Sequence, residues 1–169
     1  MMLEHLRRMA RYNAWANRQL YDACGQLAEA EYRKPRRAFF GSIHGTLNHL
    51  LVVDWIWLAR IEGKGSPEVR LDDQPCGSLA ELREARAVED ARMVRLVDGY
   101  AEDDLPKSVC YRLITRPEAT ETPLHICWLH LFNHQTHHRG QVHDQLSQTE
   151  IAPPPLDLIY YLRRAGDPG

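Results

Sequence analysis

The sequence predicts an all-α fold, an up-down four-helix bundle with a longer crossover and a short C-terminal helix. Apolar residues recur with the helical period in four long segments, at 2–27, 42–61, 78–98 and 122–147. The stretches between them are rich in glycine, proline and charged residues, which end helices. With 169 residues, of which 44% are hydrophobic, the chain can bury a core of its own. We therefore expect a single domain that covers residues 1–169.

The first predicted helix, residues 2–27, carries two asparagines on its apolar stripe. Asn13 and Asn17 share that stripe with leucine, methionine and alanine side chains. An asparagine in such a position commonly bonds a neighbouring helix inside the core, and this is the role we expect. Both side chains could also orient the groups of a polar site.

The second predicted helix, residues 42–61, is apolar almost all round. His49 is centred on one side of it. Leucines cover much of the opposite side: Leu47, Leu50, Leu51 and Leu58. Such a helix is either central in its fold or shared with a second subunit. Our hypothesis is that the side bearing His49 fills the bundle core and the leucine side packs against a second copy of the chain.

The third predicted helix follows a loop at 63–77 and opens with a capping box. Ser78 and Glu81 stand in the S-x-x-E pattern, in which each side chain satisfies the backbone N–H of the other residue. The helix is expected to run to about Asp98 without a metal ligand. Its inward residues are predicted to be Leu82, Ala85, Val88, Met93 and Leu96.

The remaining boundaries depend on local signals. Residues 99–121 are predicted to be irregular, with a weak strand pattern at 108–115. Thr122 is expected to be the N-cap of the fourth helix and Pro123 its first residue, because proline's fixed φ suits that position. After three consecutive prolines at 153–155, residues 156–164 are predicted to form the short last helix.

Six of the nine histidines lie in the fourth predicted helix, and two of them are placed to share a metal ion. His138 falls in the middle of the apolar side and His134 near its edge. At this i, i+4 spacing their Cβ atoms are about 6 Å apart. Packed helices lie about 8–10 Å apart, so His49 could complete a three-imidazole site, the ligand set of an open zinc centre. The alternative is that these are hydrogen-bonded core histidines.

Other catalytic patterns do not occur in the sequence. It contains no H-E-x-x-H, G-x-S-x-G or G-x-G-x-x-G. No carboxylate stands on the histidine face of either helix, so the sequence identifies no general base and no catalytic residue. Cys127, about two turns before His134 on the same face, could act as a thiol nucleophile, but the role of a small buried hydrophobe suits it better. Activation of a water would therefore fall on the metal.

Composition argues against nucleic acid and membranes as partners. The formal net charge is −2, and the arginines at 33–37 fit a solvated loop. The richest apolar run, residues 50–59, is too short to span a bilayer and contains Asp54. The four cysteines show no C-x-x-C spacing. Cysteines scattered in this way are typical of reduced thiols. We therefore expect a cytoplasmic protein.

Four blocks together resemble the DinB family, the DinB/YfiT-like metalloproteins. They are YNAWAN at 12–17, TLNHL at 46–50, NHQTHHRGQ at 133–141 and DLIYYL at 157–162. The resemblance covers nearly the whole chain. It implies a bundle that is commonly dimeric, with a divalent ion held by His49, His134 and His138. Members with known activity transfer or isomerise using low-molecular-weight thiols such as bacillithiol or mycothiol.

Two functions follow as expectations. The first is a metal-dependent enzyme that activates a low-molecular-weight thiol or water against a small electrophile. Zinc is the expected ion, while nickel, iron or copper also suit three imidazoles. The second is a non-enzymatic, metal-stabilised homodimer with a binding or stress-response role. Asn13, Asn17, Cys127 and Gln141 are expected to surround the ligands or to line the pocket.

Overall fold

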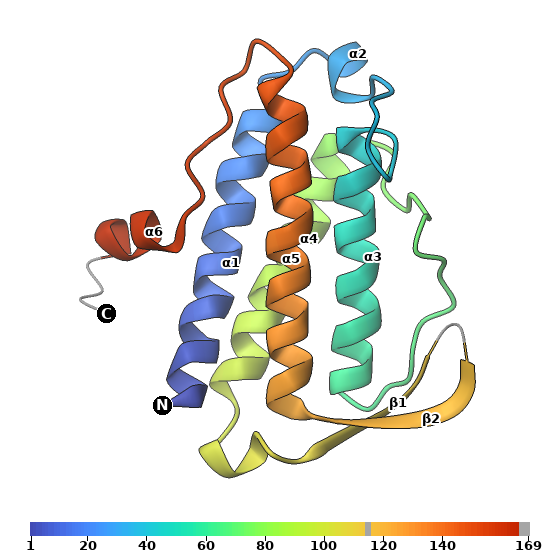
Figure 1. Ribbon diagram of the computed structural model, residues 1–169, viewed down its shortest axis with the longest axis vertical. Coiled ribbons are helices and arrows are strands. Elements are labelled where there is room, and N and C mark those ends of the chain that lie inside the picture. Colours follow the sequence, from blue (N-terminus) through green and yellow to red (C-terminus); the bar gives the residue numbers. More distant parts are fainter. Residues whose placement is uncertain (114–115, 166–169) are drawn as a thin grey trace.

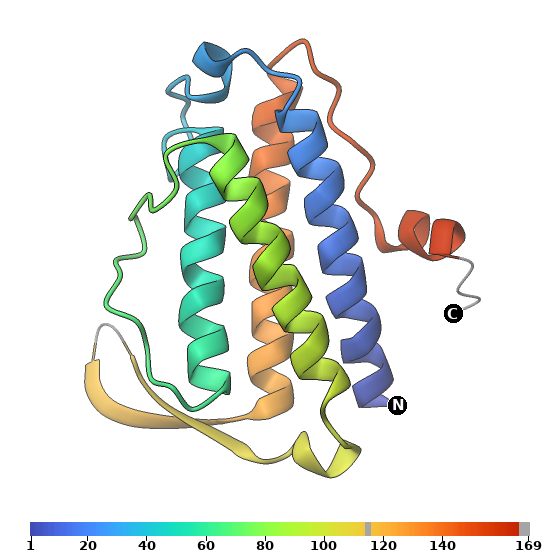
Figure 2. The same cartoon turned by 180° about the vertical axis from the view of Figure 1, so that it is seen from behind.

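The computed structural model describes residues 1–113 and 116–165, and it confirms the all-α bundle (Figure 1). The long helices are α1 (Met2–Cys24), α3 (Ile43–Ile61), α4 (Leu79–Asp98) and α5 (Leu124–Ser147). Helix α1 contacts α4 and α5, and α3 contacts the same two helices. Figures 1 and 2 show that α1 and α5 run in one direction and that α3 and α4 run in the other. The segment 62–78 is therefore the longer crossover, because it must return along the bundle.

Shorter elements complete the described part of the chain. They are α2 (Glu29–Tyr32), the 3-10 turn η1 (Glu102–Asp104), the strands β1 (Ser108–Leu113) and β2 (Arg116–Pro123), and α6 (Leu158–Ala165). The strands pair antiparallel, with Ser108 opposite Pro123, and close one end of the bundle (Figure 1). The weak strand pattern predicted at 108–115 is confirmed at 108–113, whereas the expectation that residues 116–121 are irregular was wrong. Only the first strand carried a sequence signal, and the end of that signal, at 114–115, lies outside the described residues.

The starts of α4 and α5 show which local sequence signals predicted a helix boundary correctly. Ser78 and Glu81 form the predicted capping box, with Ser78 Oγ 3.2 Å from the Glu81 N–H nitrogen. The predicted cap of α5 was wrong, because Thr122 and Pro123 belong to β2. The backbone N–H of Leu124 instead donates to the Lys107 carbonyl at 2.8 Å. The segment that leads into the hairpin thus caps the helix that bears most of the histidines.

A layer of buried polar residues divides the core into two apolar clusters. One cluster includes Leu6 of α1 and Trp128 of α5, and the other includes Leu20 and Val142 of the same two helices. The polar layer lies between them on all four long helices: Asn13 and Asn17, Asp54, Arg86 and Asp90, and Gln135 and Arg139. These residues are at most 7% exposed, so their hydrogen-bond partners are mainly one another.

The leucine face of α3 is not available to a second copy of the chain. Leu47, Leu51 and Leu58 are fully buried and Leu50 is 2% exposed, all within one chain. The helix is apolar all round because α4, α5 and β1 contact it. This leucine face therefore cannot form the predicted dimer interface, and the homodimer itself stays a prediction.

One further burial assignment was wrong, on α4. Val88 was expected to face inward but is 60% exposed, whereas the charged Arg86 and Asp90 are buried. The inward face of α4 is thus partly ionic, which the apolar period could not reveal. Over the described residues, no helix has the length and apolar character that crossing a bilayer requires.

Candidate metal centre

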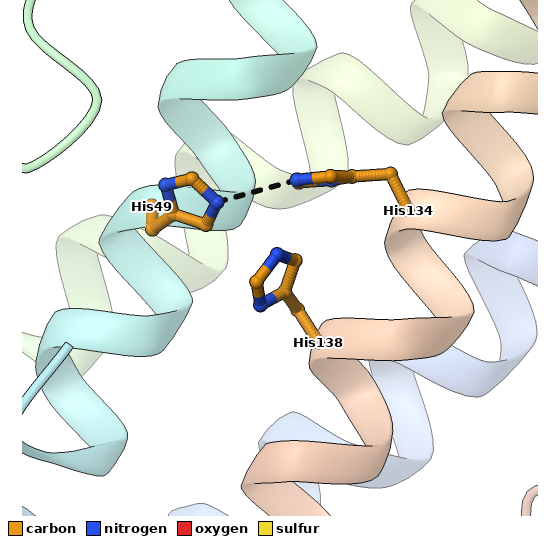
Figure 3. A group of neighbouring side chains, drawn as sticks. All are labelled: His49, His134 and His138. Atoms are coloured by element: carbon orange, nitrogen blue, oxygen red, sulfur yellow. Dashed lines mark hydrogen bonds between the residues drawn. The ribbon is translucent and has the colours of Figure 1, made fainter. Parts of the chain in front are cut away.

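His49 of α3 and His134 and His138 of α5 converge between the two helices (Figure 3). Each offers a ring nitrogen, and these three nitrogens all lie within 4.8 Å of one another. The ring centroids of His134 and His138 are 4.3 Å apart, and that of His49 is 5.2 Å and 4.6 Å from them. The expected juxtaposition of one histidine with an i, i+4 pair is therefore present.

Hydrogen bonds fix the orientation of two of these rings. His49 Nδ1 donates to the Leu71 carbonyl at 2.8 Å, and His138 Nδ1 donates to Gln141 Oε1 at 2.8 Å. Each Nδ1 must carry the proton, because the partner oxygen only accepts. Each Nε2 therefore keeps its lone pair. Gln141, expected near the ligands, holds one of them directly, and its amide also donates to His137 Nε2 at 3.0 Å.

The donor set fits a divalent cation. His49 Nε2 lies 3.3 Å from His134 Nε2, so two ring nitrogens face each other at close range. Without a cation, one of them must be protonated to avoid opposing lone pairs. His134 Nδ1 is buried and has no hydrogen-bond partner among the described residues. A cation between the rings would use the facing Nε2 lone pairs of His49 and His134.

Burial keeps the three imidazoles neutral, which is the form that binds metal. It lowers the pKa of His49 to about 4, against a smaller opposing effect of the Leu71 carbonyl. Burial and the neighbouring imidazoles lower the pKa of His134 to about 3. Burial also lowers the pKa of His138, although its bond to Gln141 acts in the opposite direction. All three rings are therefore available as ligands near neutral pH.

The metal-free protein should lose stability in acid because of these histidines. In the unfolded chain they take up protons near pH 6.5, whereas in the folded chain His49 does so only near pH 4 and His134 near pH 3. Below pH 6.5 the unfolded state binds more protons, so the free energy of unfolding falls as the pH decreases through this window. Urea titrations in chelator at about pH 7 and pH 5 measure this fall in the free energy of unfolding. The fall should be smaller in His49→Asn than in the wild type. Equal losses would contradict this assignment.

Phe40 covers one side of the centre. Its ring stacks on His49 with centroids 3.8 Å apart and meets His138 edge-on at 5.5 Å. Gly45 allows this approach, because a Cβ at that position would lie 2.2 Å from the Phe40 carbonyl oxygen. Phe40 could not be predicted from the sequence, since a loop residue before a helix has no periodic partner.

Asn13 and Asn17 serve the core rather than the metal ligands. Their amide groups donate to Asp90 Oδ1 at 3.2 and 2.9 Å, and their carbonyl oxygens accept from Arg139. They thus join α1 to α4 and α5, as their first interpretation predicted. Any influence on the ligands is indirect, through Arg139, the residue after His138.

A cavity of about 250 Å³ opens beside the centre. His49 and His134 form part of its wall, together with Val53, Trp57 and Leu71. Among the described residues that line it there is no carboxylate. Cys127 does not line it either; its buried thiol donates to the Thr122 carbonyl, and burial raises its pKa. The small buried hydrophobe is thus the role that the structure supports for Cys127.

The other histidines have different surroundings. His44 bonds Tyr32 and Asn48 within the core, and His125 donates to the Leu105 carbonyl. His130 lines the cavity wall against Trp57. None of these belongs to the group of three.

Gln141 should contribute to metal affinity although its side chain is not among the three donors. Gln141→Leu removes the acceptor that holds His138, so we expect metal binding to weaken between about ten- and a hundredfold. Gln141→Glu keeps an acceptor and should retain most of the affinity. Competition with a chromophoric chelator measures both variants, and an unchanged affinity in Gln141→Leu would contradict this role.

Two comparisons with known proteins find matches over most of the chain. The family model described as DinB family matches residues 2–168. Protein DinB of Bacillus subtilis (strain 168) is 29% identical over 161 residues, which cover 89% of this chain and 90% of that protein. Together with the three-histidine group, this match fits a metal-binding protein.

Proposed function

The chain belongs to the DinB family, and on this premise we propose that it is a metal-dependent enzyme. His49, His134 and His138 would hold one divalent ion, with zinc the first choice. The protein would activate a low-molecular-weight thiol or a water against a small electrophile. The observation that carries the proposal is a group of three neutral imidazoles beside a cavity.

The number of protein ligands supports a catalytic site over a purely structural one. The group holds three candidate side chains, and no fourth histidine, cysteine or carboxylate joins it among the described residues. Structural zinc sites commonly have four protein ligands, whereas catalytic sites keep one position for water or substrate. The adjoining cavity gives a small molecule a route to that position. These features favour the enzyme over an ion that only stabilises the bundle.

Three residues would hold the ion, and others orient these ligands or shape their surroundings. When bound, a divalent ion on three neutral ligands lowers the pKa of a thiol or water at the remaining position. The Leu71 carbonyl and Gln141 hold His49 and His138 in the tautomers that ligation needs. Phe40 stacks on His49 and shields that side from water. The apolar cavity wall binds the body of the substrate.

A paired thiol assay tests the proposal. Low-molecular-weight thiols are offered to the metal-loaded protein together with alkyl halide or epoxide electrophiles, with and without a chelator. We expect thiol consumption that the chelator abolishes, that added zinc restores, and that His138→Ala lacks. A rate that is the same in metal-loaded protein, in chelator and in His138→Ala would refute the enzymatic proposal.

A further inference from the structure

Arg60 lines the cavity that also contains His49 and His134 in its wall. It follows His49 by 11 positions on α3, which returns it to the same helix face after about three turns. Its side chain is buried, with the residue 5% exposed, and it lines the cavity together with Trp57 and Leu113. A cation is therefore built into a pocket whose walls are otherwise mainly apolar.

The charge of Arg60 is not neutralised by the described residues. Nε donates to Ser66 Oγ at 2.9 Å and Nη2 to the Arg112 carbonyl at 3.0 Å. The guanidinium carbon also lies 4.9 Å from the centroid of the Trp57 ring and 4.8 Å from that of Tyr111. No carboxylate of the described chain forms an ion pair with it. Burying a guanidinium without a counterion is costly, so an anionic ligand in the cavity would stabilise this arrangement.

Other buried arginines show the contrast. Arg86 pairs with Asp54, and Arg36 pairs with Glu31 at 2.6 Å. Arg139 donates to amide and hydroxyl oxygens inside the closed core. Arg60 alone among these four combines an unpaired charge with a cavity.

We propose that Arg60 binds the anionic group of the small molecule that enters this cavity. The substrate or thiol would then be a small organic anion with a carboxylate, the group that guanidinium recognises well. About 16 Å separates the Cα atoms of His49 and Arg60 along the helix. The anionic group should thus lie several bonds from the reacting atom. This inference rests on the proposed function for the identity of the reacting atom.

A purely structural role for Arg60 makes a different prediction. Its bonds to Ser66 and Arg112 connect α3 to the crossover and to the hairpin, and a neutral donor could make similar bonds. Such a role would change stability but would not make the cavity prefer an anion over its neutral counterpart. Selectivity between a carboxylate and the matching amide therefore separates the two roles.

The test uses the full-length, metal-free protein in chelator, with hexanoate and hexanamide as probes in ligand-observed NMR. We expect hexanoate to bind about tenfold or more tightly than hexanamide. Arg60→Lys should keep much of this preference, and Arg60→Gln should remove it. Arg83→Gln, outside the cavity, should leave the preference unchanged. Equal binding of the two probes to the wild type, or an unchanged preference in Arg60→Gln, would overturn the proposal.

A second substitution guards against a variant that fails to fold. Leu113 is 37% exposed in the cavity wall, so the bundle should tolerate a change there. Leu113→Glu supplies a carboxylate and should abolish the preference for hexanoate, whereas Leu113→Gln should retain it. Identical behaviour of these two variants would also overturn the proposal. Because these measurements exclude metal, they can succeed or fail independently of the thiol assay.

Discussion

His138→Ala is expected to lose tightly bound metal, while His137→Ala keeps it. His138 takes part in the group of three, and its ring is held by Gln141. His137 is the adjacent residue, but it is exposed and accepts a hydrogen bond from the same glutamine. Removing a group that only orients a ligand commonly costs 10–100-fold in affinity, so removing a ligand should cost more than about a hundredfold.

Neighbouring histidines make this comparison a strict test of the site. Protein purified without chelators should contain about one divalent ion per chain, and competition with a chromophoric chelator gives the affinity. Circular dichroism checks that both variants remain folded. Equal metal content in the wild type and His138→Ala would exclude His138 as a ligand. Equal losses in both variants would assign the effect to the surroundings and not to one imidazole.

The histidine group could be predicted because it depends on short-range geometry. Helical periodicity places His134 and His138 on one stripe, and the apolar character of α3 places His49 in the interior. Their meeting then needs only that α3 and α5 be neighbours, which the structure confirms. The capping box at Ser78 could be predicted for the same reason, since a cap is made within a few residues.

The parts that escaped prediction depend on long-range contacts. The start of α5 is set by backbone carbonyls of Leu105 and Lys107, which no pattern near Thr122 encodes. Phe40 reaches His49 only because the backbone passes close to Gly45. Arg60 has an ordinary position near a helix end, and its unpaired charge becomes visible only when the cavity is known.

The polar layer is the most consequential of these long-range features. Gln135 donates to Asp54 at 2.6 Å, and it accepts from Arg139 at 3.4 Å. Gln135 follows His134 by one position in the sequence, and Arg139 follows His138 in the same way. The face of α5 that carries them points into the core while the adjacent face presents the histidines. The layer therefore fixes the rotation of α5 about its axis, and with it the direction of the two imidazoles.

Arg86→Met should destabilise the protein by about 3–5 kcal/mol, because it leaves buried carboxylates without their cation. Arg86 bonds Asp54 and lies 3.1 Å from Asp90 Oδ1, and these side chains are at most 9% exposed. Arg83→Met is the matched control on the same helix. Arg83 pairs with Asp22, but both side chains are about half exposed, so this loss should stay below about 1 kcal/mol. Urea unfolding measures both variants, and equal losses would contradict a special role for the buried pair.

The pH dependence separates lost charge from lost packing. Burial raises the pKa of Asp54 to about 6 although the Arg86 charge opposes this shift, so in Arg86→Met the pKa should be higher still. A raised carboxyl pKa means that the folded state gains protons first, so stability falls as the pH rises through that range. The deficit of Arg86→Met should therefore shrink at about pH 5, and Asp54→Asn in the same background should restore part of it near pH 7. If Arg86→Met removed only packing contacts, neither the lower pH nor Asp54→Asn would reduce the loss of stability. Metal affinity should weaken together with stability, because the polar layer that loses Arg86 also orients the helix bearing His134 and His138.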